Sequence, residues 1–206
     1  MLKLNDRKWN ALHIGSLFQI KRPKARSEKD YAVGNIPFVA SGNINNGVIK
    51  CCIPQEGEIL DEGNCISVSP VDGSAFYHEY NFLGRGGAGS SILLLYNSNL
   101  NRYSGLFMTR MIRQTCEKYC YGKMGNQESI KHERIMLPMD KYESPDYAFM
   151  VEYIKERELL LLDKYKHFIH RNAKTIGDGG KKSLPNPIEN LFPSRYIYRN
   201  KPRKTA

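Results

Sequence analysis

Short apolar runs separated by glycine-containing turns dominate the first half of the chain. Each run is shorter than an ordinary helix, and turn residues separate it from the next, a pattern typical of β-strands joined by tight turns. We expect strands over residues 36–40, 47–53, 65–68, 74–77 and 91–96, with glycines at positions 34, 42, 47, 57, 63 and 73 in or beside the turns. A run at residues 106–113 fits either the end of a helix or a buried strand. The pattern predicts an α/β (α+β) fold that is rich in strands.

A different pattern begins at Pro145. Proline behind Ser144 and before Asp146 is typical of a helix start, and apolar residues at helical spacing continue to residue 169. At about 1.5 Å per residue, such a helix is roughly 37 Å long. Residues 159–162 are four consecutive leucines that point all round the helix, so the helix needs a second surface to bury them. We predict a coiled coil or other partner contact through Met150, Ile154, Leu161, Tyr165 and Phe168, although the stripe could instead pack on the chain's own domain.

Length and composition predict the domain organisation. A chain of 206 residues with 41% hydrophobic content can build one substantial core but not two full domains. We expect one globular domain at residues 1–144, a long helix at 145–172 that contacts a partner, and a basic tail at 173–206. The glycine, lysine and proline content of that tail is typical of a flexible segment. The sequence contains no internal repeat.

The positive charge is concentrated near the C-terminus. Residues 155–206 contain 13 Lys/Arg and 5 Asp/Glu, a balance of +8, whereas the other residues contain 18 and 16, a balance of +2. Nucleic acid is the commonest partner of such patches, because each neutralised phosphate releases counterions. The tail could also be a solubilising end, since charged runs are often simply solvated.

Two glycine-flanked polar segments, at residues 34–48 and 118–138, carry the candidate recognition residues, because loops on a rigid scaffold commonly present side chains to a partner. Amide, hydroxyl and ammonium groups there have the donors and acceptors that read base edges. Asn45, Asn46 and Gly47 could alternatively form only a hairpin turn. The candidate base contacts are Asn43, Asn45, Asn46, Tyr121, Lys123, Asn126 and Gln127, and the candidate phosphate contacts are Arg22, Lys24, Arg26, Arg85 and Lys131.

Motifs for catalysis are missing from the sequence. There is no GxxxxGK[ST] phosphate loop, and the glycine-rich segment at residues 84–91 lacks the lysine that would reach a phosphate. Asp146 is not followed by the Glu-x-Lys of metal-dependent nucleases. His167 and His170 are three residues apart on the predicted helix but have no carboxylate fixed beside them to complete a metal site. We therefore expect no catalytic residues, metal or cofactor in this chain.

Cellular context follows from three further observations. No apolar run approaches the roughly 18 residues that span a bilayer, and residues 1–7 lack the apolar middle of a signal peptide. The five cysteines are an odd number and include no CxxC pair. We expect a cytoplasmic protein without membrane contact, in which the cysteines are buried, reduced thiols.

The order of these segments resembles a target recognition domain of the specificity subunits of Type I restriction-modification systems, and of related subunits in Type IIB-like enzymes. The resemblance covers residues 9–172. The matching segments are WNALHIGSLFQI, GNIPFVASGNINNGV, GNCISVS, AFYHEYNF, NRYSGLFMTRMI, KYCYGKMGNQESIKHERIMLP and PDYAFMVEYIKE. Each segment alone is a weak signal, and the specificity lies in their order along the chain.

The resemblance implies a non-catalytic protein that reads one half of a bipartite target in double-stranded DNA. It also implies a methyltransferase (M) subunit that uses S-adenosylmethionine, and a restriction (R) subunit that uses ATP and Mg²⁺. Subunits of that family carry two recognition domains and two long helices, whereas this chain has one of each, so we expect either a homodimer through the helix or a fragment. The alternatives are a stand-alone DNA-binding or anti-restriction regulator, and an enzyme of unrecognised type that uses residues 84–91.

Overall fold

The computed structural model describes residues 1–87 and 91–176. The chain divides into two compact units, Met1–Arg157 and Glu158–Ala206. The described part of the second unit is the C-terminal portion of one long helix. The predicted tail lies almost wholly outside the described residues.

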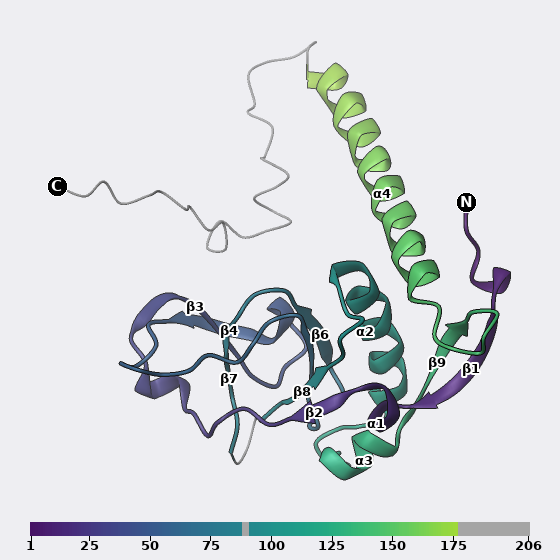
Figure 1. Cartoon of the computed structure of the whole chain (residues 1–206). Coiled ribbons are helices and arrows are strands. Elements are labelled where there is room, and N and C mark those ends of the chain that lie inside the picture. Colours follow the sequence, from purple (N-terminus) through teal and green to yellow (C-terminus); the bar gives the residue numbers. More distant parts are fainter. Residues whose placement is uncertain (88–90, 177–206) are drawn as a thin grey trace. The chain divides into compact units, whose positions relative to one another are not determined.

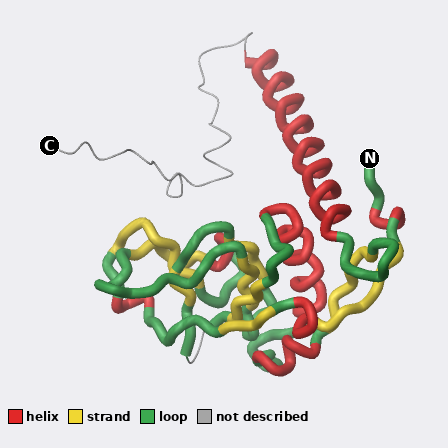
Figure 2. Tube along the Cα trace, in the orientation of Figure 1, coloured by secondary structure: helices red, strands yellow, loops and turns green. Residues whose placement is uncertain are grey.

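The first unit is rich in strands joined by loops, as expected (Figures 1 and 2). Its strands are β1 (Lys8–His13), β2 (Gln19–Lys21), β3 (Val33–Val39), β4 (Val48–Cys52), β5 (Cys65–Val68), β6 (Ala75–His78), β7 (Leu83–Gly84), β8 (Leu93–Tyr96) and β9 (Arg134–Met139). Its helices are α1 (Ile14–Leu17), α2 (Arg102–Cys116), α3 (Gln127–His132) and the start of α4 (Tyr147–Ile176), with short 3₁₀ turns at Leu4–Asp6, Glu28–Asp30 and Asn45–Gly47. All five predicted strands are present, with ends that differ by up to three residues.

The strands form three small sheets. β2, β8, β5 and β6 make a four-stranded antiparallel sheet, β3 pairs with β4 and β7, and β1 pairs with β9. Helix α2 lies between the four-stranded sheet and the β1–β9 pair (Figure 1). The main core forms where these elements meet, and its fully buried side chains include Ile66, Leu95, Met108, Ile112, Ile135 and Leu137.

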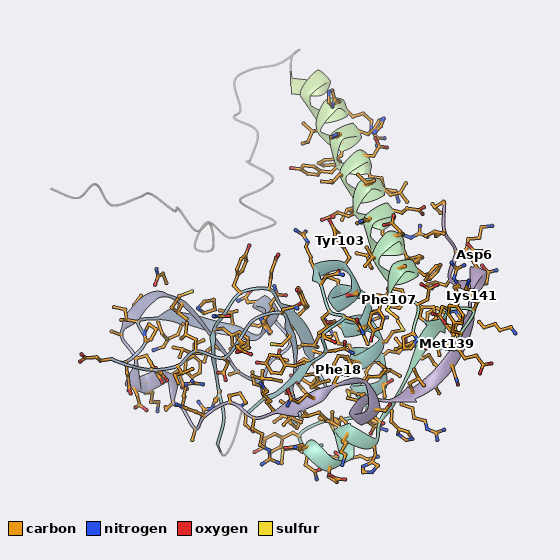
Figure 3. All side chains as sticks on the ribbon, viewed as in Figure 1. Asp6, Phe18, Tyr103, Phe107, Met139 and Lys141 are labelled. Atoms are coloured by element: carbon orange, nitrogen blue, oxygen red, sulfur yellow. The ribbon has the colours of Figure 1, made fainter. Side chains whose placement is uncertain are left out.

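The ambiguous run at residues 106–113 is helical. It lies within α2, whose first turn is capped by Asn101, because the Asn101 side chain accepts hydrogen bonds from the backbone N–H groups of Tyr103 and Ser104. Such a cap satisfies N–H groups that have no partner inside the helix. Phe107 on the buried face of α2 stacks against Trp9 and meets the ring of Tyr153 on α4 edge-on (Figure 3).

Helix α4 begins at Tyr147, two residues after Pro145. Asp146, which the sequence placed in the first turn, caps the helix instead: its Oδ1 accepts from the backbone N–H of Phe149 at 2.9 Å and its Oδ2 from Arg7 Nε at 2.8 Å. A carboxylate at this position also interacts favourably with the helix dipole. Arg7 lies over the ring of Phe149, so the N-terminal segment is fastened to the start of the helix.

The first turns of α4 belong to the first unit, and this corrects part of the predicted partner surface. Met150 is fully buried in the main core, and Ile154 packs against the same core. Met150 therefore has no surface for a second molecule, whereas Ile154 is partly buried and keeps part of its surface. In the second unit, by contrast, Leu161 is 69% exposed and Phe168 is 57% exposed, while Tyr165 is partly exposed.

The five cysteines are free thiols that differ in burial. Cys52, Cys65 and Cys116 are buried free thiols, Cys51 is half-buried, and Cys120 is exposed, so burial was predicted wrongly for the last. Burial raises the pKa of Cys65 to about 12, which keeps that thiol protonated and unreactive.

Across residues 1–87 and 91–176, none of the helices combines the length and apolar character needed to span a bilayer.

Candidate nucleic-acid interface

The two polar segments that the sequence singled out approach the same third loop, the β5–β6 turn at residues 69–74. The backbone N–H of Gly125 donates to the carbonyl oxygen of Pro70 at 2.7 Å, and Ser74 Oγ donates to the carbonyl oxygen of Gly42 at 3.1 Å. Residues 40–47 and 120–127 are therefore both held to one turn. Loops positioned by a rigid scaffold are where binding residues concentrate.

The β5–β6 turn is itself fixed against the end of α2. Gly73 has φ +67°, and a Cβ at this position would lie 1.9 Å from the carbonyl oxygen of Cys116. Only glycine fits a left-handed position with so close a backbone neighbour. The sequence analysis recognised Gly73 as a turn residue but did not connect this turn with the recognition segments.

Residues 45–47 form the connection between β3 and β4. Asn45, Asn46 and Gly47 have φ values of 49°, 55° and 73°, and the backbone N–H of Ala40 donates to the carbonyl oxygen of Gly47 at 2.9 Å. Asparagine tolerates this left-handed conformation better than most residues. The turn interpretation is thus correct for the backbone. The side chains of Asn45 and Asn46 are exposed, and base reading by them stays a prediction.

The loop at residues 120–127 has two kinds of side chain. Tyr121 is 86% exposed and Lys123 is exposed, so both point to solvent. Asn126 instead caps α3, with its Oδ1 accepting from the backbone N–H of Ser129 at 2.8 Å. Gln127 Oε1 accepts from Arg22 Nε at 2.8 Å, which joins a predicted base contact to a predicted phosphate contact. Asn126 is fixed to α3 as its cap, through both its side chain and its backbone N–H, so this side chain has a structural role and is not proposed as a base contact.

A buried tyrosine anchors the base of this loop. The Tyr119 hydroxyl donates to a carboxylate oxygen of Glu133, and Lys118 Nζ lies 2.7 Å from the other oxygen. Burial, followed by the hydrogen bond to Glu133, raises the pKa of Tyr119 to about 12, so the hydroxyl stays a donor. The exposed part of the loop therefore starts from a fixed point.

A pocket of about 360 Å³ lies where these loops meet the glycine-rich segment. Arg22, Val71, Gly86, Met124 and Gln127 are among its lining residues. Gly86 brings two loops into contact, because its N–H donates to the carbonyl oxygen of Lys24 and a Cβ would lie 2.1 Å from the carbonyl oxygen of Pro23. Residues 88–90 of the glycine-rich segment lie outside the described part of the chain.

The predicted phosphate contacts differ in accessibility. Arg22, Lys24 and Lys131 have exposed side chains. Arg85 is only partly exposed and forms an ion pair with Glu28, which occupies part of its guanidinium. Cations already paired with a carboxylate contribute less to binding of a polyanion, because that pair must be broken or shared.

Arg26 is buried, which corrects its assignment as a phosphate contact. Its guanidinium lies 2.7 Å from Glu58 Oε1 and 2.6 Å from Asp61 Oδ2, and it also donates to the carbonyl oxygens of Ile59 and Gly84. Burial raises the pKa of the Glu58 carboxyl, but hydrogen bonds from Arg26 and Tyr31 outweigh this effect and hold the pKa below its ordinary value. Arg26 therefore stabilises the loops beneath the interface and cannot reach a DNA backbone.

Two arginines that the sequence analysis did not select lie beside the same loops. Arg113 on α2 donates from Nη2 to Asn43 Oδ1 at 2.6 Å, and Arg110 one turn earlier is exposed. Two arginines three residues apart on one helix face are a pattern in the sequence that could have predicted this pair. The run at residues 106–113 was interpreted only through its apolar residues, so the pair was not predicted.

Among residues 1–87 and 91–176 there is no group of three or more His, Cys, Asp and Glu side chains placed to hold a metal ion. The arrangement instead offers hydrogen-bond donors, acceptors and positive charge on loops, which suits recognition of a polar, negatively charged partner.

Comparisons with known proteins also point to recognition of DNA. A family model described as "Type I restriction modification DNA specificity domain" matches residues 6–161. The chain is 30% identical over 158 residues to the Type II restriction enzyme BgcI specificity subunit S.BcgI of Heyndrickxia coagulans, a match that covers 75% of this chain and 45% of that protein.

Two solved structures share the fold. One is the S subunit of a Type I restriction-modification system from M. genitalium, with a TM-score of 0.50, 16% identity, and coverage of 82% of this chain and 43% of that one. The other comes from a study of complex assembly and conformational transition of the Type I system, with a TM-score of 0.52, 17% identity, and coverage of 81% and 42%. This chain thus spans less than half the length of the relatives it matches.

Proposed function

The chain belongs to the family of Type I restriction modification DNA specificity domains, and from this premise we propose that it reads one half-site of a bipartite sequence in double-stranded DNA. The observation that carries the proposal is the attachment of two distant polar segments to the β5–β6 turn, which gathers exposed donors and cations on neighbouring loops. The chain does this as a recognition subunit without chemistry of its own. Methylation and cleavage then belong to partner M and R subunits, which supply S-adenosylmethionine, ATP and Mg²⁺, in the cytoplasm.

The side chains on these loops suit the reading of base edges. Asparagine and glutamine amides carry a donor and an acceptor side by side, which matches the major-groove edge of adenine, while lysine matches the acceptors of guanine. Asn45, Asn46, Tyr121 and Lys123 are exposed for such contacts, and Gln127 is oriented by Arg22. A rigid framework favours discrimination, since less conformational entropy is lost on binding.

Base reading is tested by binding-site selection from randomised DNA duplexes with Asn45→Gly and Gln127→Ala. Glycine at position 45 accepts the positive φ of that turn, so the first change removes the side chain without straining the backbone. We expect each variant to lose preference at one base pair, with discrimination reduced by about 1–3 kcal/mol there and unchanged elsewhere. Asn5→Ala removes an exposed amide of the N-terminal segment and is the matched control. Selection of the wild-type sequence by both variants would remove these side chains from base reading.

Phosphate contacts are tested through the salt dependence of binding. Replacing Lys24 or Lys131 by glutamine should weaken binding to every sequence alike, whereas Arg22→Gln should also weaken the preference at the base pair read by Gln127, which Arg22 orients. Each change should lower the slope of log K against log salt by about one. Lys3→Gln in the N-terminal segment removes an equally exposed charge and should leave the slope unchanged. If the variant with all three changes keeps the wild-type slope, other residues contact the phosphates, most simply the basic residues after Lys155.

A further inference from the structure

Arg113 is held in one orientation by two neighbours. Its Nη2 donates to Asn43 Oδ1 at 2.6 Å, and its guanidinium carbon lies 5.3 Å from the centroid of the Phe76 ring. The ring supports the flat cation from one side, while the asparagine holds one end of it. The hydrogen bond to Asn43 uses one of the five N–H donors of the guanidinium, so an edge with further donors stays available.

The cleft around Arg113 is lined by both arginines and carboxylates, and this combination of charges favours some ligands over others. It has a volume of about 90 Å³ and is lined by Asn43, Asp72, Gly73, Ser74, Arg110, Arg113 and Glu117. Among the residues that the structure describes, neither arginine forms an ion pair with the two acids. Burial raises the pKa of Asp72, but hydrogen bonds from Ser69 and Ser74 outweigh it and lower that pKa, so the carboxylate is charged at neutral pH.

Carboxylates beside the guanidinium disfavour a phosphate and favour a base pair. A phosphate is negatively charged and would be repelled by Asp72 and Glu117, whereas the edge of a base pair is neutral. Guanine presents two acceptors in the major groove that match an arginine edge, and its cytosine partner presents an amino donor that a carboxylate accepts. Bidentate reading also needs a guanidinium plane of fixed direction, which Asn43 and Phe76 provide.

We propose that Arg113, oriented by Asn43 and Phe76, reads the guanine of one G·C base pair within the half-site, a role that rests on the function proposed above. Asn43 then acts as a positioning residue through the oxygen that faces Arg113, rather than as a base contact in its own right. Arg110 lies on the same helix face, lines the same cleft and is exposed, but in the described part of the chain no hydrogen bond or ring contact orients its guanidinium as Asn43 and Phe76 orient Arg113.

The test compares Arg113→Ala, Arg113→Lys and Asn43→Ala with the wild-type full chain in binding-site selection, followed by competition between duplexes that differ at one base pair. For Arg113→Ala we expect discrimination at a single G·C position to fall by about 5- to 150-fold, with other positions unchanged. Lysine keeps the charge and can still reach the guanine acceptors, but it lacks the planar fork, so Arg113→Lys should retain binding to random DNA and lose only part of that discrimination. Asn43→Ala should weaken the discrimination at the same G·C base pair, but only partly.

Three outcomes overturn the inference, and they are distinguishable. If the wild-type chain selects no sequence, the proposed function fails and the inference fails with it. If the wild type selects a sequence and Arg113→Ala selects the same one with the same ratios, only the inference fails. If Arg113→Ala weakens all duplexes alike and lowers the salt slope by about one, Arg113 is a phosphate contact. Arg110→Ala is the control for a uniform loss, and thermal unfolding of each variant separates these effects from loss of folding.

Discussion

Replacement of Arg26 by alanine is expected to lower the free energy of unfolding by about 3–5 kcal/mol, because it leaves two buried carboxylates without their shared cation. The Arg26 side chain is 3% exposed, and those of Glu58 and Asp61 are 11% and 16% exposed, so solvent cannot replace the lost donors well. The carbonyl oxygens of Ile59 and Gly84 lose their hydrogen bonds from Arg26 as well. Urea denaturation of the full chain, followed by circular dichroism, measures the change.

Lys24→Ala is the matched control for this substitution. Lys24 lies two residues earlier in the same loop, but its side chain is exposed, so its loss should change stability by no more than about 0.5 kcal/mol. Adding Glu58→Gln and Asp61→Asn to Arg26→Ala removes the orphaned charges and should restore part of the stability. If Arg26→Ala is as stable as Lys24→Ala, the buried ion pairs contribute nothing to stability and Arg26 does not support these loops.

The same ion pairs predict a pH dependence with a definite sign. Arg26 helps to hold the pKa of Glu58 below its ordinary value of 4.5 in the folded state. The resulting stabilisation is present above the unfolded-state pKa and is lost as the pH falls through the folded-state pKa. Other carboxylates contribute similarly in both proteins, so the difference in stability between wild type and Arg26→Ala isolates this contribution. We expect that difference to shrink as the pH is lowered below about 4.5.

Leu161→Asp is expected to convert a dimer into a monomer at micromolar concentration. We propose that α4 pairs antiparallel with α4 of a second copy through Leu161, Tyr165 and Phe168. Leu161 and Phe168 have largely exposed side chains, and burying each is worth about 1.5–3 kcal/mol against the entropy lost on association. A two-fold pair presents two identical readers in opposite senses, so its DNA target would be an inverted repeat with a spacer.

Analytical ultracentrifugation of the full chain, with and without target DNA, tests the pairing. His167→Asp places the same charge on an exposed polar position of the same helix segment and should leave the dimer intact. In footprinting, Leu161→Asp should lose the bipartite protection but keep that of a single half-site. A wild-type chain that stays monomeric even with DNA would contradict self-pairing, and the apolar stripe would then belong to a helix of an M subunit or of a different half-subunit.

Local patterns were enough to predict five of the nine strands and the long helix in the described part of the chain. The five strands and the long helix follow from apolar periodicity and from turn residues such as Gly47 and Gly73, because these properties act over a few neighbouring residues. Asp146 was recognised as a helix-terminal residue for the same reason. The family was also recognisable, since the order of segments is a property of the sequence itself.

Long-range packing decided what the local patterns left open. The pairing of β1 with β9 joins residues more than a hundred positions apart, and the β5–β6 turn links residues 40–47 with residues 120–127, which are also distant in sequence. Arg26 and Arg22 look alike in the sequence, yet one is buried against Glu58 and Asp61 while the other is exposed.

Met150 and Leu161 likewise share one helix pattern but not one environment. Met150 faces the core of the first unit, whereas Leu161 is exposed to solvent. By itself, the sequence determined the strands β3, β4, β5, β6 and β8, the turns between them and the long helix α4, because those preferences are local. Which polar side chain faces the solvent and which one compensates a buried charge was decided only by the tertiary structure, because that depends on groups that the fold brings together from distant positions.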